Sequence, residues 1–311
     1  MTALAELRVI AFPGAPNLPT FAAMEHGWFR RHGVEVSIEL TISSLAQAER
    51  VAAGECDIAC TAFDNVVAYS SGQGAPGVDP GYVVIMGATQ LELSLVVDPA
   101  IDTHADLAGQ SIALDALGTG FAFVLYEMLE RAGVDHHSCH FVPVGATPQR
   151  WLSVKSGTHA ATLTIEPFTS LARASGFRIL DTSSRLFDSY QGGVVAARRA
   201  VLDERPGAVR GFIDGYLDGL AWMLEPSKRT AVADLLVHRM NLDPSAVQPV
   251  LDSVLSSESG LTPDAELLPD GMATVLALRS RYGPGGTSDG IEAFTDLRLW
   301  ELAIESRRGG A

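Results

Sequence analysis

The sequence predicts an α/β protein made of two related lobes, with an interlobe cleft and a helical C-terminal region. In the first half, short β-rich runs alternate with helical patterns, which is typical of βαβ units and a mostly parallel sheet. The segment Thr20–Val34 is repeated one hundred positions later as Gly120–Val134, with the same Gly-Val step after the helix. From about Pro206 onward the strand pattern nearly disappears and helical spacing dominates.

The elements of the first half follow from these patterns. Strands are expected at Leu7–Phe12, Glu35–Leu40, Asp57–Thr61 and Tyr82–Gly87, and helices at Thr20–His32 and Ser44–Ala53. The repeat predicts the same order again in the second lobe. It aligns His136–His140 with the strand that contains Val36–Ile38.

Two apolar runs, Leu91–Val97 and Tyr190–Ala197, connect the repeats. We therefore expect lobe one to comprise residues 1–93 plus 195–311, and lobe two residues 94–194. Two connecting segments leave a cleft between the lobes, which is a favoured place for a small ligand.

The C-terminal region is expected to be helical. In its first helix, apolar residues from Val209 to Leu224 recur at steps of three and four. Further helices are expected at Lys228–Met240, Pro244–Leu255, Asp270–Arg281 and Ile291–Ser306.

Composition excludes several classes of protein. The 311 residues carry 37 acidic and 22 basic side chains, a formal charge of −15, which disfavours nucleic acid and anionic membranes as partners. No apolar stretch is long enough for membrane insertion. As written, the N-terminus has no export signal, so we expect a periplasmic protein if a leader was removed and a cytoplasmic one if Met1 is the native start.

Four loops at the carboxyl ends of expected strands are the candidate ligand-binding segments, because open α/β sheets bind ligands there. Three of them open onto helix N-termini, and glycines let the backbone approach a ligand. The expected ligand-binding residues are Phe12, Asn17, Phe63, Asp64, Asn65, Gly118, Thr119, Gly120, Phe121 and Glu166. The alternative is that the acids and amides are caps and the glycines are turns.

The acidic residues near the cleft suggest the chemistry of the ligand. Asp64, Glu92, Asp115 and Glu166 lie near its expected edges, whereas the four loops contain no arginine or lysine. This pattern favours an amino-bearing or heteroaromatic organic ligand over a simple oxyanion. Solvated surface acids are the alternative.

Catalytic and metal signatures are mostly absent from the sequence. There is no G-x-S-x-G elbow, P-loop lysine, H-E-x-x-H or C-x-x-C motif, so we expect no catalytic residue and no cofactor. The His136–His140 run could ligate a metal, but on a strand its side chains would be split between two faces, so no metal is expected.

Three motifs resemble one family. The segment Glu25–Val36, with the Gly-Trp-Phe and Gly-Val steps, is similar to a signature of solute-binding proteins from ABC importers of the alkanesulfonate, taurine and nitrate type. Gly54–Ala59 and Leu107–Ala113 resemble two further motifs of that family. The resemblance covers about residues 7–282 and implies a type II periplasmic-binding-protein fold that closes on a small organic ligand, with an ABC permease as partner if the protein is exported.

Two alternatives remain open at this stage. The superfamily also contains cytosolic enzymes, including thiamine-pyrimidine synthases and small-acid decarboxylases, which would act on a heteroaromatic or carboxylic substrate. The missing cysteine-rich run argues against the pyrimidine-synthase chemistry. A ligand sensor without a transporter is the other alternative.

Overall fold

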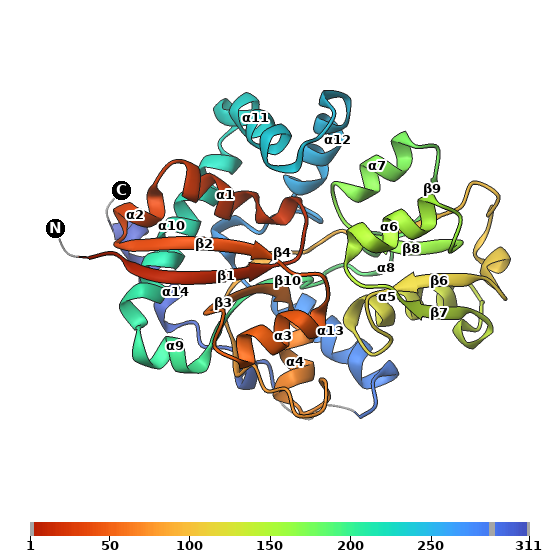
Figure 1. The fold of residues 1–311 in the computed structure, drawn as a ribbon, viewed down its shortest axis with the longest axis horizontal. Helices are drawn as coiled ribbons and strands as arrows, with labels where there is room; N and C mark the ends of the chain where they lie inside the picture. Colours follow the sequence, from red (N-terminus) through yellow and green to blue (C-terminus); the bar gives the residue numbers. More distant parts are fainter. Residues whose placement is uncertain (1–2, 286–289, 310–311) are drawn as a thin grey trace.

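The computed structural model describes residues 3–285 and 290–309, and each of its two lobes is centred on a five-stranded sheet (Figure 1). The sheet of lobe one has the order β2-β1-β3-β10-β4, and that of lobe two the order β7-β6-β8-β5-β9. The first comprises β1 (Ala5–Ala11), β2 (Val34–Leu40), β3 (Ile58–Ala62), β4 (Tyr82–Thr89) and β10 (Gly193–Arg198). The second comprises β5 (Ser94–Val97), β6 (Ser111–Leu114), β7 (His140–Pro143), β8 (Ala161–Thr164) and β9 (Arg178–Thr182).

The two sheets have the same pairing pattern. β1 is parallel to β2 and β3, as β6 is to β7 and β8, and each sheet then has one antiparallel strand, β10 or β5, before its edge. β5 directly follows lobe one in the chain, and β10 directly follows lobe two. The predicted fold class, an α/β protein with two lobes, is therefore confirmed.

Matched glycines give the repeat a physical basis. Gly33 and Gly133 both have a positive φ, at 80° and 78°, and Gly54 and Gly157 have φ of 73° and 75°. A side chain is strained in this left-handed region, so glycine is the residue that ends each helix cleanly before the next strand.

Helices cover both sheets. Those of the first repeat are α1 (Leu18–Glu25), α2 (Trp28–Arg31), α3 (Ser44–Ala52) and α4 (Phe63–Ser70). Lobe two has α5 (Gly120–Arg131), α6 (Thr147–Lys155), α7 (Phe168–Ala174) and α8 (Ser183–Leu186). The C-terminal region has α9 (Arg199–Glu204), α10 (Pro206–Leu224), α11 (Arg229–Met240), α12 (Pro244–Val254), α13 (Pro269–Tyr282) and α14 (Arg298–Gly309).

Three expected elements were wrong in detail. The helix expected at Thr20–His32 is two helices, because Gly27 takes a left-handed conformation between them. The helix expected at Ile291–Ser306 is a 3₁₀ turn followed by α14. His136–Ser138 form a 3₁₀ turn that Asp135 caps, and β7 begins only at His140.

Apolar packing joins the two lobes. α10 packs on α1 and α2 and completes the core of lobe one. α13 lies between α4 of lobe one and α5 of lobe two, and one buried cluster continues through Phe63, Leu278 and Phe123. The C-terminal region therefore also contacts lobe two. The division into 1–93 plus 195–311 and 94–194 stays a prediction about the units that move.

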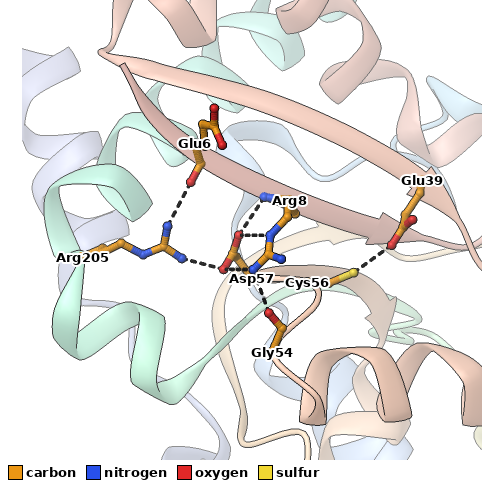
Figure 2. Close-up of polar contacts among 7 residues, drawn as sticks. All are labelled: Glu6, Arg8, Glu39, Gly54, Cys56, Asp57 and Arg205. Atoms are coloured by element: carbon orange, nitrogen blue, oxygen red, sulfur yellow. Dashed lines mark hydrogen bonds and ion pairs between the residues drawn. The ribbon is translucent and has the colours of Figure 1, made fainter. Parts of the chain in front are cut away.

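A buried carboxylate anchors the edge of lobe one opposite the other lobe (Figure 2). Asp57, 1% exposed, pairs with Arg8 of β1 and with Arg205, which directly precedes α10. Burial alone would raise the pKa of Asp57, but its hydrogen bonds from Arg8 and the charge of Arg205 outweigh that effect and lower it. The aspartate of the Gly54–Ala59 motif is thus structural: it ties β1, β3 and α10 together.

Candidate ligand-binding site

A cavity lies between the lobes. Its volume is about 90 Å³, several times the roughly 10–15 Å³ that one water molecule needs. Lobe one, counted here with the whole of β10, contributes Phe12, Pro16, Asn17, Cys60, Thr61, Ala62, Asn65, Ala88, Thr89, Leu91, Gly193, Val194 and Tyr216 to its lining. Lobe two contributes Asp115, Thr119, Gly120, Phe121, Ala146, Thr147, Arg150 and Ile165.

Four helices begin at the cavity. Their N-cap residues, all in the lining, are Asn17 for α1, Ala62 for α4, Thr119 for α5 and Ala146 for α6. Among the described residues, no side chain caps any of these four N-termini. Helix N-termini carry partial positive charge, so the lining favours a negatively charged group. Not every N–H is free, because Pro19 and Pro148 have none and those of Leu18 and Phe63 are bonded to Ala15 and Gly192.

Arg150 supplies a full positive charge at the same place. It lies on the first turn of α6, is 1% exposed, and donates from Nη2 to Thr147 Oγ1 at 2.8 Å. Its Nε and Nη1 are buried and have no hydrogen-bond partner within the described part of the chain. Burial lowers the pKa of Arg150 to about 10, and the group therefore still carries its charge at neutral pH.

Two further polar groups of the lining are buried without a partner among residues 3–285 and 290–309. They are Oδ1 of Asp115, in the loop after β6, and the hydroxyl of Tyr216, on α10. Burial raises the pKa of Tyr216 above its usual range, so the hydroxyl remains protonated and can donate. Buried polar atoms usually have partners, so a cluster of unpartnered ones at a cavity points to a ligand.

Six of the ten expected ligand-binding residues line this cavity: Phe12, Asn17, Asn65, Thr119, Gly120 and Phe121. Two amides among them are already oriented by the chain, since Asn17 Nδ2 donates to the carbonyl of Phe12 and Asn65 Nδ2 donates to Thr61 Oγ1. The other four expected residues, Phe63, Asp64, Gly118 and Glu166, are not in its described lining.

Asp64 is occupied by the protein itself. Arg279 of α13 donates to its carboxylate from Nε at 2.7 Å and from Nη2 at 2.6 Å, and both side chains are buried. The same Nη2 donates to the carbonyl of Gly118, which lies in lobe two. The expectation that Asp64 accepts hydrogen bonds from the ligand stays a prediction, and in this arrangement both of its oxygens already accept from Arg279.

Gly120 is needed for the approach of the two lobes. A Cβ atom at this position would lie 2.6 Å from Cβ of Asp64, so any side chain would force the α5 N-terminus away from α4. Phe63, beside Asp64, is wholly buried against Phe294 rather than lining the cavity.

Glu166 lies next to the cavity, in a smaller hollow that it shares with Glu92 and the segment 253–261. Its carboxylate accepts hydrogen bonds from the Oγ and N–H of Ser170. Burial raises the pKa of Glu166 to about 7, against the effect of those bonds. It is thus not a permanently charged acceptor for the ligand.

Arg150 was not among the expected residues, because only four loops were considered and this residue follows a fifth loop, on the first turn of α6. The strand was expected at His136–His140, but β7 spans His140–Pro143, so the loop after it was not considered. The signal that could have revealed it is the helix start Thr147-Pro148, with an arginine in the first turn.

Hydrogen bonds cross between the lobes on several sides of the cavity. Ala15 N–H donates to the carbonyl of Glu166 at 3.0 Å, and Ala146 N–H donates to that of Ile42 at 2.8 Å. Ser44 N–H donates to Asp115 Oδ2 at 3.2 Å. The structure is therefore a closed arrangement of the lobes.

One thiol, that of Cys60, lies in the described lining of the cavity. Thiolates are good nucleophiles, but burial raises the pKa of the Cys60 thiol to about 12, so it is neutral at ordinary pH. The described lining contains no histidine or lysine, and its carboxylate is that of Asp115.

The histidine run lies elsewhere in lobe two. The argument that strand alternation splits its side chains was wrong, since Asp135, His136 and His137 have ligand atoms within 4.8 Å of one another on the 3₁₀ turn. His136 Nδ1 is also 2.7 Å from Glu130 Oε1. The absence of a bound metal here stays a prediction.

Comparisons with known proteins agree with this geometry. The family model described as NMT1/THI5 like matches residues 16–229. No curated protein sequence matches the chain. No helix in the described ranges has the length and apolar character to span a membrane.

Solved structures share the fold at low sequence identity. A protein of Bordetella bronchiseptica RB50 has a TM-score of 0.80 at 22% identity, covering 98% of both chains. The periplasmic nitrate-binding protein of Synechocystis PCC 6803 has a TM-score of 0.83 at 12% identity, covering 98% of this chain and 90% of its own. The alkanesulfonate-binding protein of Xanthomonas axonopodis pv. citri, bound to MOPS, has 0.71 at 16% identity, covering 90% and 92%. The chain belongs to the NMT1/THI5-like family and has the type II periplasmic-binding-protein fold shared with solute-binding proteins of ABC importers.

Proposed function

We propose that this chain captures a small organic anion in the interlobe cavity, as the substrate-binding component of an ABC importer. The observation that carries the proposal is Arg150, a wholly buried guanidinium with two N–H-bearing nitrogens unpartnered among the described residues. A buried charge without a partner is costly, so an anionic ligand supplies what the chain leaves open.

The surrounding lining supports the same polarity. Four helix N-termini lie at the cavity. At an exposed site, one such terminus stabilises an anion by about 0.3–1 kcal/mol. Phe12, Phe121, Leu91 and Val194 provide apolar walls for an organic body. A carboxylate or sulfonate with a short organic chain fits this combination better than a bare inorganic ion.

Contacts from both lobes would couple binding to closure. In the proposed site, residues 94–194 contact the ligand through Arg150, Thr119, Gly120 and Phe121. Residues 1–93 and 195–311 contact it through Phe12, Asn17, Asn65 and Tyr216. A ligand that touches both sets stabilises the closed state over any open one.

The test begins with native mass spectrometry of the purified protein to identify a co-purified molecule. Calorimetry then compares alkanesulfonates and alkanecarboxylates on the wild type, Arg150→Met and the matched control Lys155→Met. Lys155 is exposed on the same helix. Because Arg150 would donate at least two charge-assisted hydrogen bonds, its loss should weaken binding about a hundred-fold or more, while the control binds normally.

Equal affinity of wild type and Arg150→Met for these anions would overturn the anion site. The importer role is tested separately, by uptake of the bound anion in cells that lack the gene. Restoration by the wild type but not by Arg150→Met supports it, and normal uptake without the gene contradicts it.

A further inference from the structure

Helix α13 contacts both lobes, although residues 195–311 are expected to move with lobe one (Figure 1). It starts beside the segment that returns the chain to lobe one, where Leu268 N–H donates to Gln191 Oε1 at 2.9 Å. From there it runs between α4 of lobe one and α5 of lobe two. Its position therefore allows one helix to hold the two lobes together.

Arg279 of α13 joins the N-terminal ends of α4 and α5. Its ion pair with Asp64 fixes it to the first turn of α4. Its Nη2 also donates to the carbonyl of Gly118, directly before the N-cap of α5, at 3.2 Å. Both helices begin at the cavity, and Gly120 allows their close approach. Separating the lobes at this point would leave a wholly buried guanidinium with fewer partners, which is unfavourable.

The C-terminal end of α13 is bound to Glu127 of α5. Tyr282 donates from its hydroxyl, and Arg281 from Nη1, to Oε2 of this carboxylate, each at 2.8 Å. Arg131 of α5 donates to Oε1 at 2.7 Å. Glu127 is buried, and burial alone would raise its pKa, but these partners outweigh burial and lower it. The carboxylate is thus held in its charged form between the two helices.

Apolar packing continues the contact between α13 and α5. Tyr282 stacks on Phe123 with ring centres 6.3 Å apart, and it meets Tyr126 edge to face at 5.7 Å. Val275 and Leu278 of α13 are buried in one cluster with Phe123. Moving lobe two away from α13 would return this apolar surface to water, which is also unfavourable.

These contacts do not involve a ligand. Their side chains are outside the described lining of the cavity, and the hydrogen-bond partners named above all belong to the chain. Contacts of this kind stabilise the closed arrangement whether the cavity is filled or empty.

We propose that α13 is a clasp that keeps the two lobes closed without ligand, with Arg279 joining α4 to α5 and Glu127 holding the end of the helix. A ligand then adds to an existing preference for the closed state instead of creating it, and it enters during transient openings. The proposal concerns the ligand-free protein, so it does not depend on the charge or identity of the ligand.

Hydrogen exchange of three amides reports on closure. The N–H groups of Ala15, Ser44 and Ala146 donate across the lobes, so they lose their acceptors when the lobes open. Ligand is removed by unfolding in guanidinium chloride, dialysis and refolding, and its absence is checked by native mass spectrometry. NMR then follows exchange at these three amides and, as an internal control, at amides within β1 and β6.

Two variants loosen the clasp from opposite sides. Arg281→Ala combined with Tyr282→Ala removes both donors on α13, and Glu127→Gln removes the charge on α5. The control is Arg308→Ala, at an exposed arginine near the end of α14.

In the ligand-free wild type and in the control, the three amides should exchange about a hundred-fold or more slowly than unprotected peptides. The double variant should exchange them about ten-fold or more faster than the wild type, and Glu127→Gln should change them in the same direction. The amides within β1 and β6 should keep their wild-type rates in both variants.

Three results would overturn the clasp. Exchange of the three amides at unprotected rates in the ligand-free wild type would show that the lobes are open without ligand. Wild-type rates in either variant would show that the contact between Glu127 and α13 does not hold the closure. An equal acceleration within β1 and β6 would show that these contacts stabilise the whole fold and not the closed arrangement.

Discussion

Two arginines lie wholly buried near the junction of the lobes, and their surroundings differ completely. Arg279, on α13, donates to both oxygens of Asp64, to Gln73 and to the carbonyl of Gly118, and it lies over the ring of Phe123. Arg150, on α6, makes one hydrogen bond, to Thr147, and lies 5.6 Å from the ring centre of Phe121.

The difference separates a structural charge from the one proposed to bind the ligand. Every partner of Arg279 belongs to the chain, so its burial is compensated on folding and it holds the lobes together. Arg150 keeps two nitrogens unpartnered in the described part of the chain, and in the proposed site a bound anion supplies the missing partner. Burial alone does not distinguish them; the identity of the partners does.

The largest effect is expected from removing the structural arginine. Arg279→Met leaves Asp64 as a buried, unpaired carboxylate and should lower the free energy of unfolding by about 3–5 kcal/mol. Urea denaturation of the ligand-free protein measures it. The double variant Arg279→Met with Asp64→Leu should recover much of the loss. If the double variant is no more stable than the single one, the pair does not have this role.

Glu166 is a third buried ionisable residue, and its effect on the free energy of unfolding should depend on pH. Burial raises its pKa from the 4.5 that is usual for a glutamate to about 7. Its contribution to the free energy of unfolding is therefore present below about pH 4.5 and is lost as the pH rises through about 7.

Glu166→Gln should consequently be more stable than the wild type at pH 8, by up to about 3 kcal/mol, and should show little difference at pH 4. Denaturation curves at several pH values, with the exposed Glu258→Gln as control, measure this difference. A difference that does not change between pH 4 and 8 would show that burial does not shift this group.

Removing Arg150, the arginine of the proposed site, should change the free energy of unfolding in the opposite direction to removing Arg279. Arg150→Met eliminates a buried group with unsatisfied donors and should raise the free energy of unfolding of the ligand-free protein by about 1–3 kcal/mol. The same variant should lose anion binding. If it is destabilised as strongly as Arg279→Met, Arg150 is a structural residue and the comparison fails.

The smallest effect is expected at Tyr216. Its hydroxyl is buried without a partner among the described residues, so Tyr216→Phe should leave the ligand-free stability unchanged within about 1 kcal/mol. Affinity for the co-purified ligand should fall if that hydroxyl binds it from lobe one. Unchanged affinity would show that Tyr216 only forms the wall.

The local pattern of the sequence predicted the repeat and most strands, because alternation, helical spacing and left-handed glycines act over a few residues. It predicted six residues of the cavity for the same reason, since loops after parallel strands converge at one edge of a sheet. It failed where one residue ends or starts an element, as Gly27 does between α1 and α2 and Asp135 does by capping the turn at His136–Ser138.

The sequence by itself determined the two-lobed α/β architecture and the rough position of the site. The tertiary structure alone decided which charges are free. Asp64 pairs with an arginine 215 positions away, which no local pattern could indicate, whereas Nε and Nη1 of Arg150 have no partner among residues 3–285 and 290–309. The electrostatics of a cavity depend on long-range pairing of charges, so the proposed polarity of the ligand rests on the tertiary structure, which shows the partners of each buried charge.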